Sequence, residues 1–188
     1  MQISASMVKE LREKTGAGIM DAKRALEEVD GNMDKAAQII AQQGLARAEK
    51  KTDRVAAQGL VEPYIHGGGR IGAMVEVNCE TDFVARTPDF QSLAHDIAMQ
   101  VAALNPKYIS ESEIPEDELN IRAEEVGSKD EAVKQLALLS QEFIKDSGKN
   151  IEEVIKDNIA KLGENIVVRR FSRFELGETA PSADESED

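Results

Sequence analysis

The sequence predicts an α+β fold, in which three short helices precede a core with a three-stranded antiparallel sheet flanked by helices. The first observation is a change in the spacing of apolar residues. It is helical up to about residue 44, has a period of two between residues 60 and 79, and is helical again before a last strand at 166–176. The second is the length of 188 residues, which suits one ordinary domain with a smaller unit attached.

The composition limits the classes of partner. Hydrophobic residues make up 41% of the chain and aromatic residues only 4%, so the core must consist mainly of aliphatic side chains. The net charge of −13 disfavours binding to nucleic acid or to an anionic membrane surface, and it suits a protein that binds other proteins. The sequence shows no signal peptide and no apolar stretch of transmembrane length, which predicts a cytoplasmic location without membrane contact.

Residues 1–44 predict three helices. Ser4 can cap the first, and the two glycines within Thr15–Gly18 break the chain before the second. Asn32 can cap the third, and Gly44 is expected to end it.

The following segment, residues 45–58, gathers four basic side chains among small residues: Arg47, Lys50, Lys51 and Arg54. Two interpretations remain open for it, a solvated linker helix or a local contact with an acidic partner.

From Leu60 onward the pattern predicts a hairpin. A strand over Leu60–His66 is followed by three glycines, 67–69, and then by a second strand over Ile71–Cys79 whose odd positions are apolar. Pro63 cannot donate a hydrogen bond to a neighbouring strand, so the first strand is expected at the edge of the sheet or at a bulge.

Capping signals place the later helices. Thr87 and Pro88 predict the start of a long helix, and Pro115 precedes a short acidic one. A further helix is expected at about 131–145, with Phe143 on its apolar face. Asn150 then predicts a helix with a capping box that ends at Gly163.

The search for catalytic chemistry finds no convincing set. Cys79 falls on the apolar face of a strand, which predicts a buried structural thiol, and a single cysteine forms no internal disulfide. His66, expected in a loop, and His95, expected to be partly solvated, show no metal-ligand spacing. The glycine-rich stretches lack the features of a phosphate-binding loop. We therefore expect no covalent catalysis, no cofactor and no resident metal.

One connection is distinctive: Thr81–Arg86 joins the second strand to the helix after Thr87. Phe83 within it could pack back into the core. It could instead be an exposed aromatic anchor beside the carboxylate of Asp82, a residue type that dominates many interfaces.

Three runs of sequence carry a resemblance to a known family. Residues 8–23, from Val8 to Lys23, closely resemble the N-terminal signature of the elongation factor Ts family. Residues 76–86 look like its second signature, and residues 163–171 resemble its C-terminal strand. The similarity covers nearly the whole chain up to about Gly177. The interval between Glu118 and Leu138 is shorter than is usual in the family.

The resemblance implies a function and a partner. Members of this family bind elongation factor Tu (EF-Tu), in its GDP-bound and nucleotide-free states, and speed the release of GDP. Thr81, Asp82, Phe83 and Val84 match the motif that disturbs the Mg²⁺ bound to EF-Tu. Asp82 and Phe83 are expected to act directly, and the other two to shape the turn that presents them. By the same match Arg12, Ile19 and Met20 would contact EF-Tu.

The resemblance also predicts a domain organisation. Residues 1–54 would be a ubiquitin-associated (UBA)-like three-helix domain with its basic linker, residues 55–177 an α+β core, and residues 178–188 an acidic disordered tail. Short members of the family dimerise through the core sheet, which leaves a homodimer open. Two other classes are alternatives: an adaptor that uses only the first 44 residues, and a hydrolase, which the missing nucleophile and base disfavour.

Overall fold

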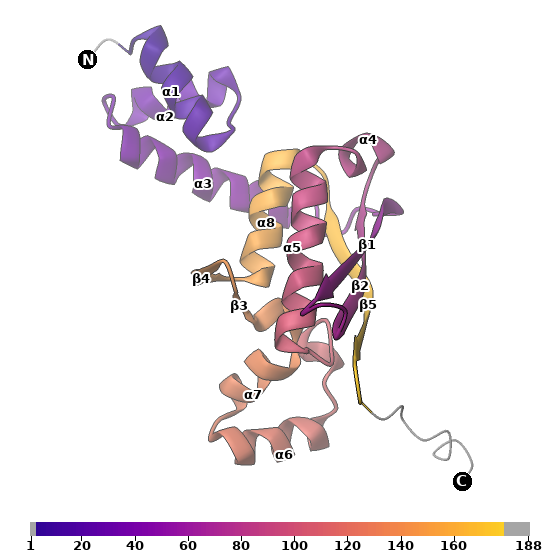
Figure 1. Ribbon diagram of the computed structural model, residues 1–188. Coiled ribbons are helices and arrows are strands. Elements are labelled where there is room, and N and C mark those ends of the chain that lie inside the picture. The colour runs from indigo at the N-terminus through magenta and orange to yellow at the C-terminus, as the bar shows by residue number, and fades with distance from the viewer. Residues whose placement is uncertain (1–2, 179–188) are drawn as a thin grey trace.

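The computed structural model describes residues 3–178, and in it the chain has the predicted α+β architecture, with an N-terminal helical unit beside an elongated core (Figure 1). The unit consists of α1 (Ala5–Thr15), α2 (Ile19–Glu28) and α3 (Met33–Glu49). Ser4 caps α1 by accepting the Met7 N–H at 3.2 Å, and Asn32 caps α3 by accepting the Lys35 N–H at 3.0 Å, as predicted. The three helices share a buried apolar cluster that consists of Leu11, Ala22, Ala25, Leu26 and Ala36.

The prediction that Gly44 ends the third helix is wrong, because α3 continues to Glu49. The reason lies in tertiary packing. At Gly44, α3 packs against α8 (Ile151–Leu162), and a Cβ at this position would lie 3.0 Å from the Cβ of Ala160. Glycine therefore serves a close approach of two helices here. The predicted linker helix over 45–58 is helical only as far as Glu49, and turns follow.

Replacing Gly44 with valine is expected to lower the free energy of unfolding by about 1–3 kcal/mol, because the added methyl groups overpack the contact with Ala160. Chemical denaturation measures the effect. Gln42→Val is the control, since Gln42 is an exposed position of the same helix. Valine is a better helix former than glycine and a poorer one than glutamine, so propensity alone would destabilise the control and not Gly44→Val. Equal destabilisation by both variants would contradict a packing role for Gly44.

The sheet contains β1 (Gln58–His66), β2 (Ile71–Cys79) and β5 (Ile166–Glu175), antiparallel in the order β1-β2-β5. The three glycines of the β1–β2 turn, at 67–69, all have positive φ, which explains their presence in a tight hairpin. Pro63 lies in the edge strand β1, as predicted. His66 is the last residue of β1, where the predicted strand Leu60–His66 ends, and it is not a loop residue as was also expected.

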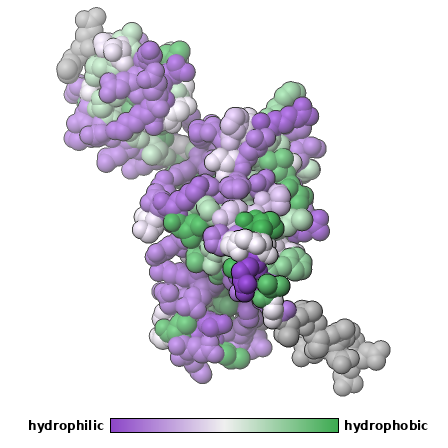
Figure 2. All heavy atoms as spheres, in the orientation of Figure 1, coloured by the Kyte–Doolittle hydropathy of each residue, from purple (hydrophilic) through white to green (hydrophobic). Residues whose placement is uncertain are grey.

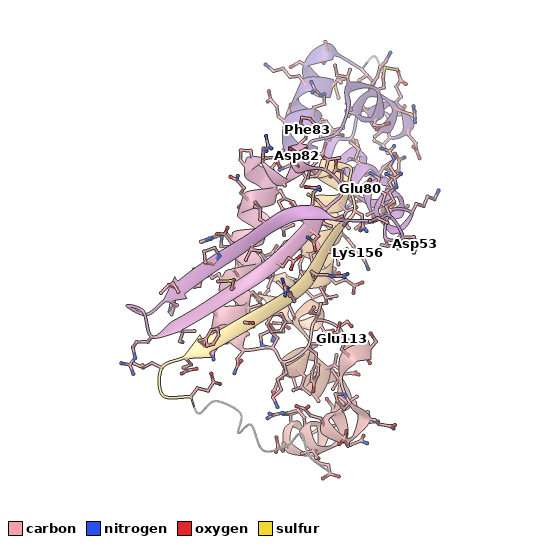
Figure 3. All side chains as sticks on the ribbon, turned by 90° about the vertical axis from the view of Figure 1, so that its right-hand side faces the viewer. Asp53, Glu80, Asp82, Phe83, Glu113 and Lys156 are labelled. Atoms are coloured by element: carbon pink, nitrogen blue, oxygen red, sulfur yellow. The ribbon has the colours of Figure 1, made fainter. Side chains whose placement is uncertain are left out.

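One face of the sheet is covered by α5 (Pro88–Leu104) and α8. The alternate residues of β2 point into this interface and are buried, as the period of two predicted: Ala73, Val75, Val77 and Cys79. Figure 3 shows the sheet in front of the helices, so its other face is open. The predicted caps are also present: Thr87 caps α5, Asn150 forms a capping box with Glu153, and Gly163 ends α8.

The far end of the core carries two helices, α6 (Glu116–Val126) and α7 (Lys129–Leu136), and then a two-stranded hairpin of β3 (Glu142–Phe143) and β4 (Asp146–Asn150). Short 3₁₀ turns lie at Glu111–Glu113 and Leu138–Ser140. α6 follows Pro115 as predicted.

The predicted helix over 131–145 is wrong beyond Leu136. Ala137 is extended and forms a parallel bridge with Tyr108, and Leu138 donates its N–H to the carbonyl of Tyr108. These bonds draw the backbone out of the helix. Phe143 still reaches the apolar core, but from a strand.

Within residues 3–178, no helix is long and apolar enough to span a lipid bilayer. The predicted acidic tail, residues 178–188, lies outside the described residues except for Glu178.

Candidate functional site

The segment Thr81–Arg86 contains a single helical turn, α4 (Asp82–Ala85), where the sequence predicted only a connection. Thr81 begins the turn as its N-cap, and its Oγ1 accepts the Val84 N–H at 3.4 Å. In Figures 1 and 3, α4 lies at the end of the core that is nearest to the N-terminal helical unit. The segment therefore forms a tip on the core, between β2 and α5.

The side chains of this tip separate into an inner and an outer pair. Ala85 is buried and Val84 packs against the core, whereas Phe83 is 79% exposed. The alternative that Phe83 packs into the core is therefore wrong. Asp82 is half-exposed and pairs with Arg86 one turn later, at 2.7 Å between Oδ2 and Nη2. The tip presents an aromatic ring and a carboxylate to solvent.

The base of the tip is held by Glu164, from the loop between α8 and β5. Its carboxylate accepts the Thr81 N–H at 2.9 Å and the Thr81 hydroxyl at 2.6 Å. The Cys79 thiol donates to the Thr81 carbonyl at 3.1 Å. Sequence reasoning missed Glu164, because 83 residues separate it from Thr81 and no spacing rule connects them.

Cys79 is a buried free cysteine, as predicted. Burial raises the pKa of its thiol, and the negative charge of Glu164 acts in the same direction. A thiol kept neutral in this way is a weak nucleophile, and its hydrogen bond to Thr81 gives it a structural role.

The three other predicted contact residues lie on the N-terminal unit. Ile19 and Met20 begin α2 and are 58% and 67% exposed, which is unusual for large apolar side chains at adjacent positions. Arg12 is exposed on α1, and its Nε donates to the carbonyl of Ala17 at 3.3 Å in the loop before them. The structure thus joins Arg12 to the loop before Ile19 and Met20, on a different part of the molecule from the tip.

The two histidines come together in the fold. His95 Nδ1 lies 3.0 Å from Glu62 Oε1, and His66 Nδ1 lies 3.1 Å from the hydroxyl of Tyr64. The ring of Tyr64 packs against both imidazoles, with its centroid 6.0 Å from that of His66 and 5.5 Å from that of His95. Among the described residues no group of three or more His, Cys, Asp or Glu side chains is arranged to hold a metal ion.

Comparison with known proteins agrees with the resemblance. A family model described as Elongation factor TS matches residues 2–131. The chain is 51% identical to the elongation factor Ts of Syntrophomonas wolfei, over 94% of this chain and 91% of that protein. It is 50% identical to that of Desulfitobacterium hafniense, with 94% and 90% covered, and 48% identical to that of Coprothermobacter proteolyticus, with 95% and 100% covered.

These matches extend over almost the full length of this chain and of each relative. The alignment with the Syntrophomonas protein has 195 positions, more than the 188 residues of this chain, so that relative carries residues absent here. This fits a short form of the family. The chain belongs to the elongation factor Ts family of translation elongation factors.

Proposed function

We propose that this protein is the guanine nucleotide exchange factor of EF-Tu, acting in the cytoplasm without covalent catalysis. It binds EF-Tu·GDP and promotes GDP release by disturbing the Mg²⁺ site, after which GTP reloads the nucleotide-free complex. The observation that carries the proposal is the tip α4, where Phe83 is exposed on a turn whose base is held by hydrogen bonds.

The chemistry of Mg²⁺ explains how such a tip could act. Mg²⁺ requires nearly ideal octahedral geometry and links nucleotide phosphates to protein ligands, so a small displacement of one ligand weakens its hold on GDP. An aromatic ring that enters a packed GTPase domain shifts its elements between discrete arrangements. In this mechanism Phe83 is the wedge and Asp82 supplies the charge beside it, while Thr81 and Val84 hold the turn in place.

We further propose that residues 1–54 act as the docking domain and residues 55–177 as the domain that performs exchange. Ile19 and Met20 offer an apolar patch to EF-Tu, and Arg12 lies beside the loop that precedes them. Exposed apolar residues that are adjacent in this way are typical of interface centres.

Linkage gives the proposal a strict consequence. If the protein weakens the affinity of EF-Tu for GDP by some factor, GDP must weaken the affinity of EF-Tu for the protein by the same factor.

The proposal is tested by the release of fluorescent GDP from EF-Tu, with and without the protein. Release at the same rate in both cases would refute it.

We also propose that the protein forms a homodimer through the open face of the sheet. Three neighbouring rows that the strand register places on this face are Val61–Glu76–Arg170, Pro63–Met74–Ser172 and Ile65–Gly72–Phe174. Val61, Ile65, Met74 and Phe174 are all exposed. Figure 2 shows apolar side chains gathered on the side of the core where the strands lie. A monomer rarely leaves an apolar sheet face of this kind uncovered.

One row of the open face is polar and already paired. Arg170 Nε donates to Glu76 Oε2 at 2.7 Å, and this hydrogen bond lowers the pKa of Glu76. Such a pair can enter an interface with its charge compensated.

Met74→Lys is expected to raise the dimer dissociation constant by about a hundredfold, because an unpaired charge would be buried at the centre of the face. Analytical ultracentrifugation measures the change. Ile121→Lys, at an exposed position of α6 away from the sheet, is the control and should leave the mass unchanged. A wild-type protein that remains a monomer at high concentration would refute the dimer.

A further inference from the structure

The loop Gly163–Asn165, between α8 and β5, contacts two segments that the proposed function assigns to different tasks. One is the tip, which it holds at Thr81 and at Glu80, the residue just before the tip. The other is residues 51–54, the part of the linker that follows α3. The name linker is used for these residues below.

Toward the tip, Glu164 forms a chain of hydrogen bonds. Its carboxylate accepts a hydrogen bond from the Thr81 hydroxyl at 2.6 Å. The oxygen of that hydroxyl can then accept a hydrogen bond from the Val84 N–H. The same carboxylate accepts the Thr81 N–H at 2.9 Å. The rotamer of Thr81 and the first turn of α4 are therefore set by Glu164, and with them the direction in which Phe83 points.

Toward the linker, Asn165 acts in the same way. Its side chain is 2% exposed, and its Nδ2 donates to the carbonyls of Thr52 at 3.0 Å and Arg54 at 2.7 Å. Its backbone N–H donates to Glu80 Oε1 at 2.7 Å, and the same Glu80 oxygen lies 3.6 Å from Arg54. Lys51 Nζ also donates to the carbonyl of Gly163 at 2.5 Å.

We propose that Glu164 and Asn165 are positioning residues that form a clamp, which fixes the tip relative to the N-terminal helical unit. The inference rests on the proposed exchange function. A wedge disturbs its target only if it arrives at a defined place when the docking unit is bound, and a misplacement of about 1 Å can cost a large part of a catalysed rate. The clamp supplies this placement, because it holds the base of α4 and the end of the linker within one loop.

The first test uses GDP release at saturating and subsaturating concentrations of the protein. Glu164→Ala is expected to lower the maximal rate by about tenfold, the effect of losing a hydrogen bond to a charged group, with little change in the half-saturating concentration. Glu164→Gln keeps one acceptor oxygen and should fall between Glu164→Ala and the wild type. Glu152→Ala is the control, because Glu152 pairs only within α8, with Lys156.

A double-mutant cycle separates positioning from a general loss of stability. If Glu164 acts through Thr81, the variant that combines Thr81→Val with Glu164→Ala should be no slower than the slower single variant. Multiplication of the two effects, or a maximal rate for Glu164→Ala equal to that of the wild type, would overturn the role of Glu164.

Hydrogen–deuterium exchange of the free protein tests the clamp without EF-Tu. Glu164→Ala should speed exchange of the amides at 82–86 by about tenfold. Asn165→Ala keeps its backbone bond to Glu80 and should speed exchange in residues 51–54. Unchanged exchange in both variants would overturn the clamp, even if the wild type accelerates GDP release. A wild type that fails to accelerate release would refute the proposed function instead.

Discussion

Replacing Phe83 with alanine is expected to lower the maximal rate of GDP release from EF-Tu by about 30-fold, which corresponds to the loss of a contact worth about 2 kcal/mol. Phe83 is largely exposed, so its removal should leave the unfolding transition nearly unchanged. Because the ring would act only after docking, the half-saturating concentration should change little. Stopped-flow release of fluorescent GDP across a range of protein concentrations separates the two quantities.

Ile121→Ala is a matched control for this variant, since Ile121 is an exposed apolar residue of α6 at the opposite end of the core (Figure 1). It should exchange nucleotide at the wild-type rate. An Ile121→Ala variant as slow as Phe83→Ala would mean that the loss is unspecific. A Phe83→Ala variant with a clearly lower free energy of unfolding would show that the ring stabilises the fold, and would contradict its role as an exposed wedge.

The double variant Ile19→Ala/Met20→Ala should have the complementary phenotype. Truncating both exposed side chains removes the apolar patch of α2, so the half-saturating concentration should rise by about tenfold or more. The maximal rate should stay close to that of the wild type, because the tip and its base are untouched. The same stopped-flow titration measures both quantities.

Leu11→Ala shows what non-specific damage to this unit looks like, because Leu11 is buried in the apolar cluster that the three N-terminal helices share. It should lower the thermal stability, whereas the double variant should not. A double variant with unchanged half-saturation would show that docking depends on another surface. A fall in its maximal rate would contradict the division of tasks between the two parts of the chain.

Local signals in the sequence predict much of this fold. Ser4, Thr87 and Asn150 cap the helices that they were expected to cap, and the period of two locates the buried face of β2. Pro63 correctly indicates an edge strand. Each cap depends on a backbone group within a few residues, and the period of two and the missing N–H of proline are properties of the strand itself, so the local sequence contains these signals.

The errors arise where distant segments decide. A glycine such as Gly44 commonly ends a helix, but here it lies inside α3. Its lack of a side chain allows Ala160 of α8 to come close. Residues 137–143 keep apolar spacing that is compatible with a helix, but hydrogen bonds to Tyr108 draw the backbone away. Neither partner is close in sequence.

The candidate site likewise combines local signals with contacts between distant segments. Composition alone could not decide whether Phe83 is buried or exposed, because an aromatic residue in a connection is compatible with both. The structure shows the ring exposed, and the resemblance suggested why it should be. The sequence did not predict the contacts of Glu164 and Asn165, since their hydrogen-bond partners lie 83 to 113 residues away.

The most direct test of the proposed exchange function is a turnover experiment with EF-Tu loaded with fluorescent GDP, in excess over this protein and in the presence of unlabelled GDP. An exchange factor is released after each cycle, so a small amount of the protein should empty and refill many EF-Tu molecules. The predicted result is accelerated loss of the fluorescent nucleotide from the entire EF-Tu pool, with a rate proportional to the concentration of the protein. Loss at the spontaneous rate, or from only as many EF-Tu molecules as there are copies of the protein, would contradict it.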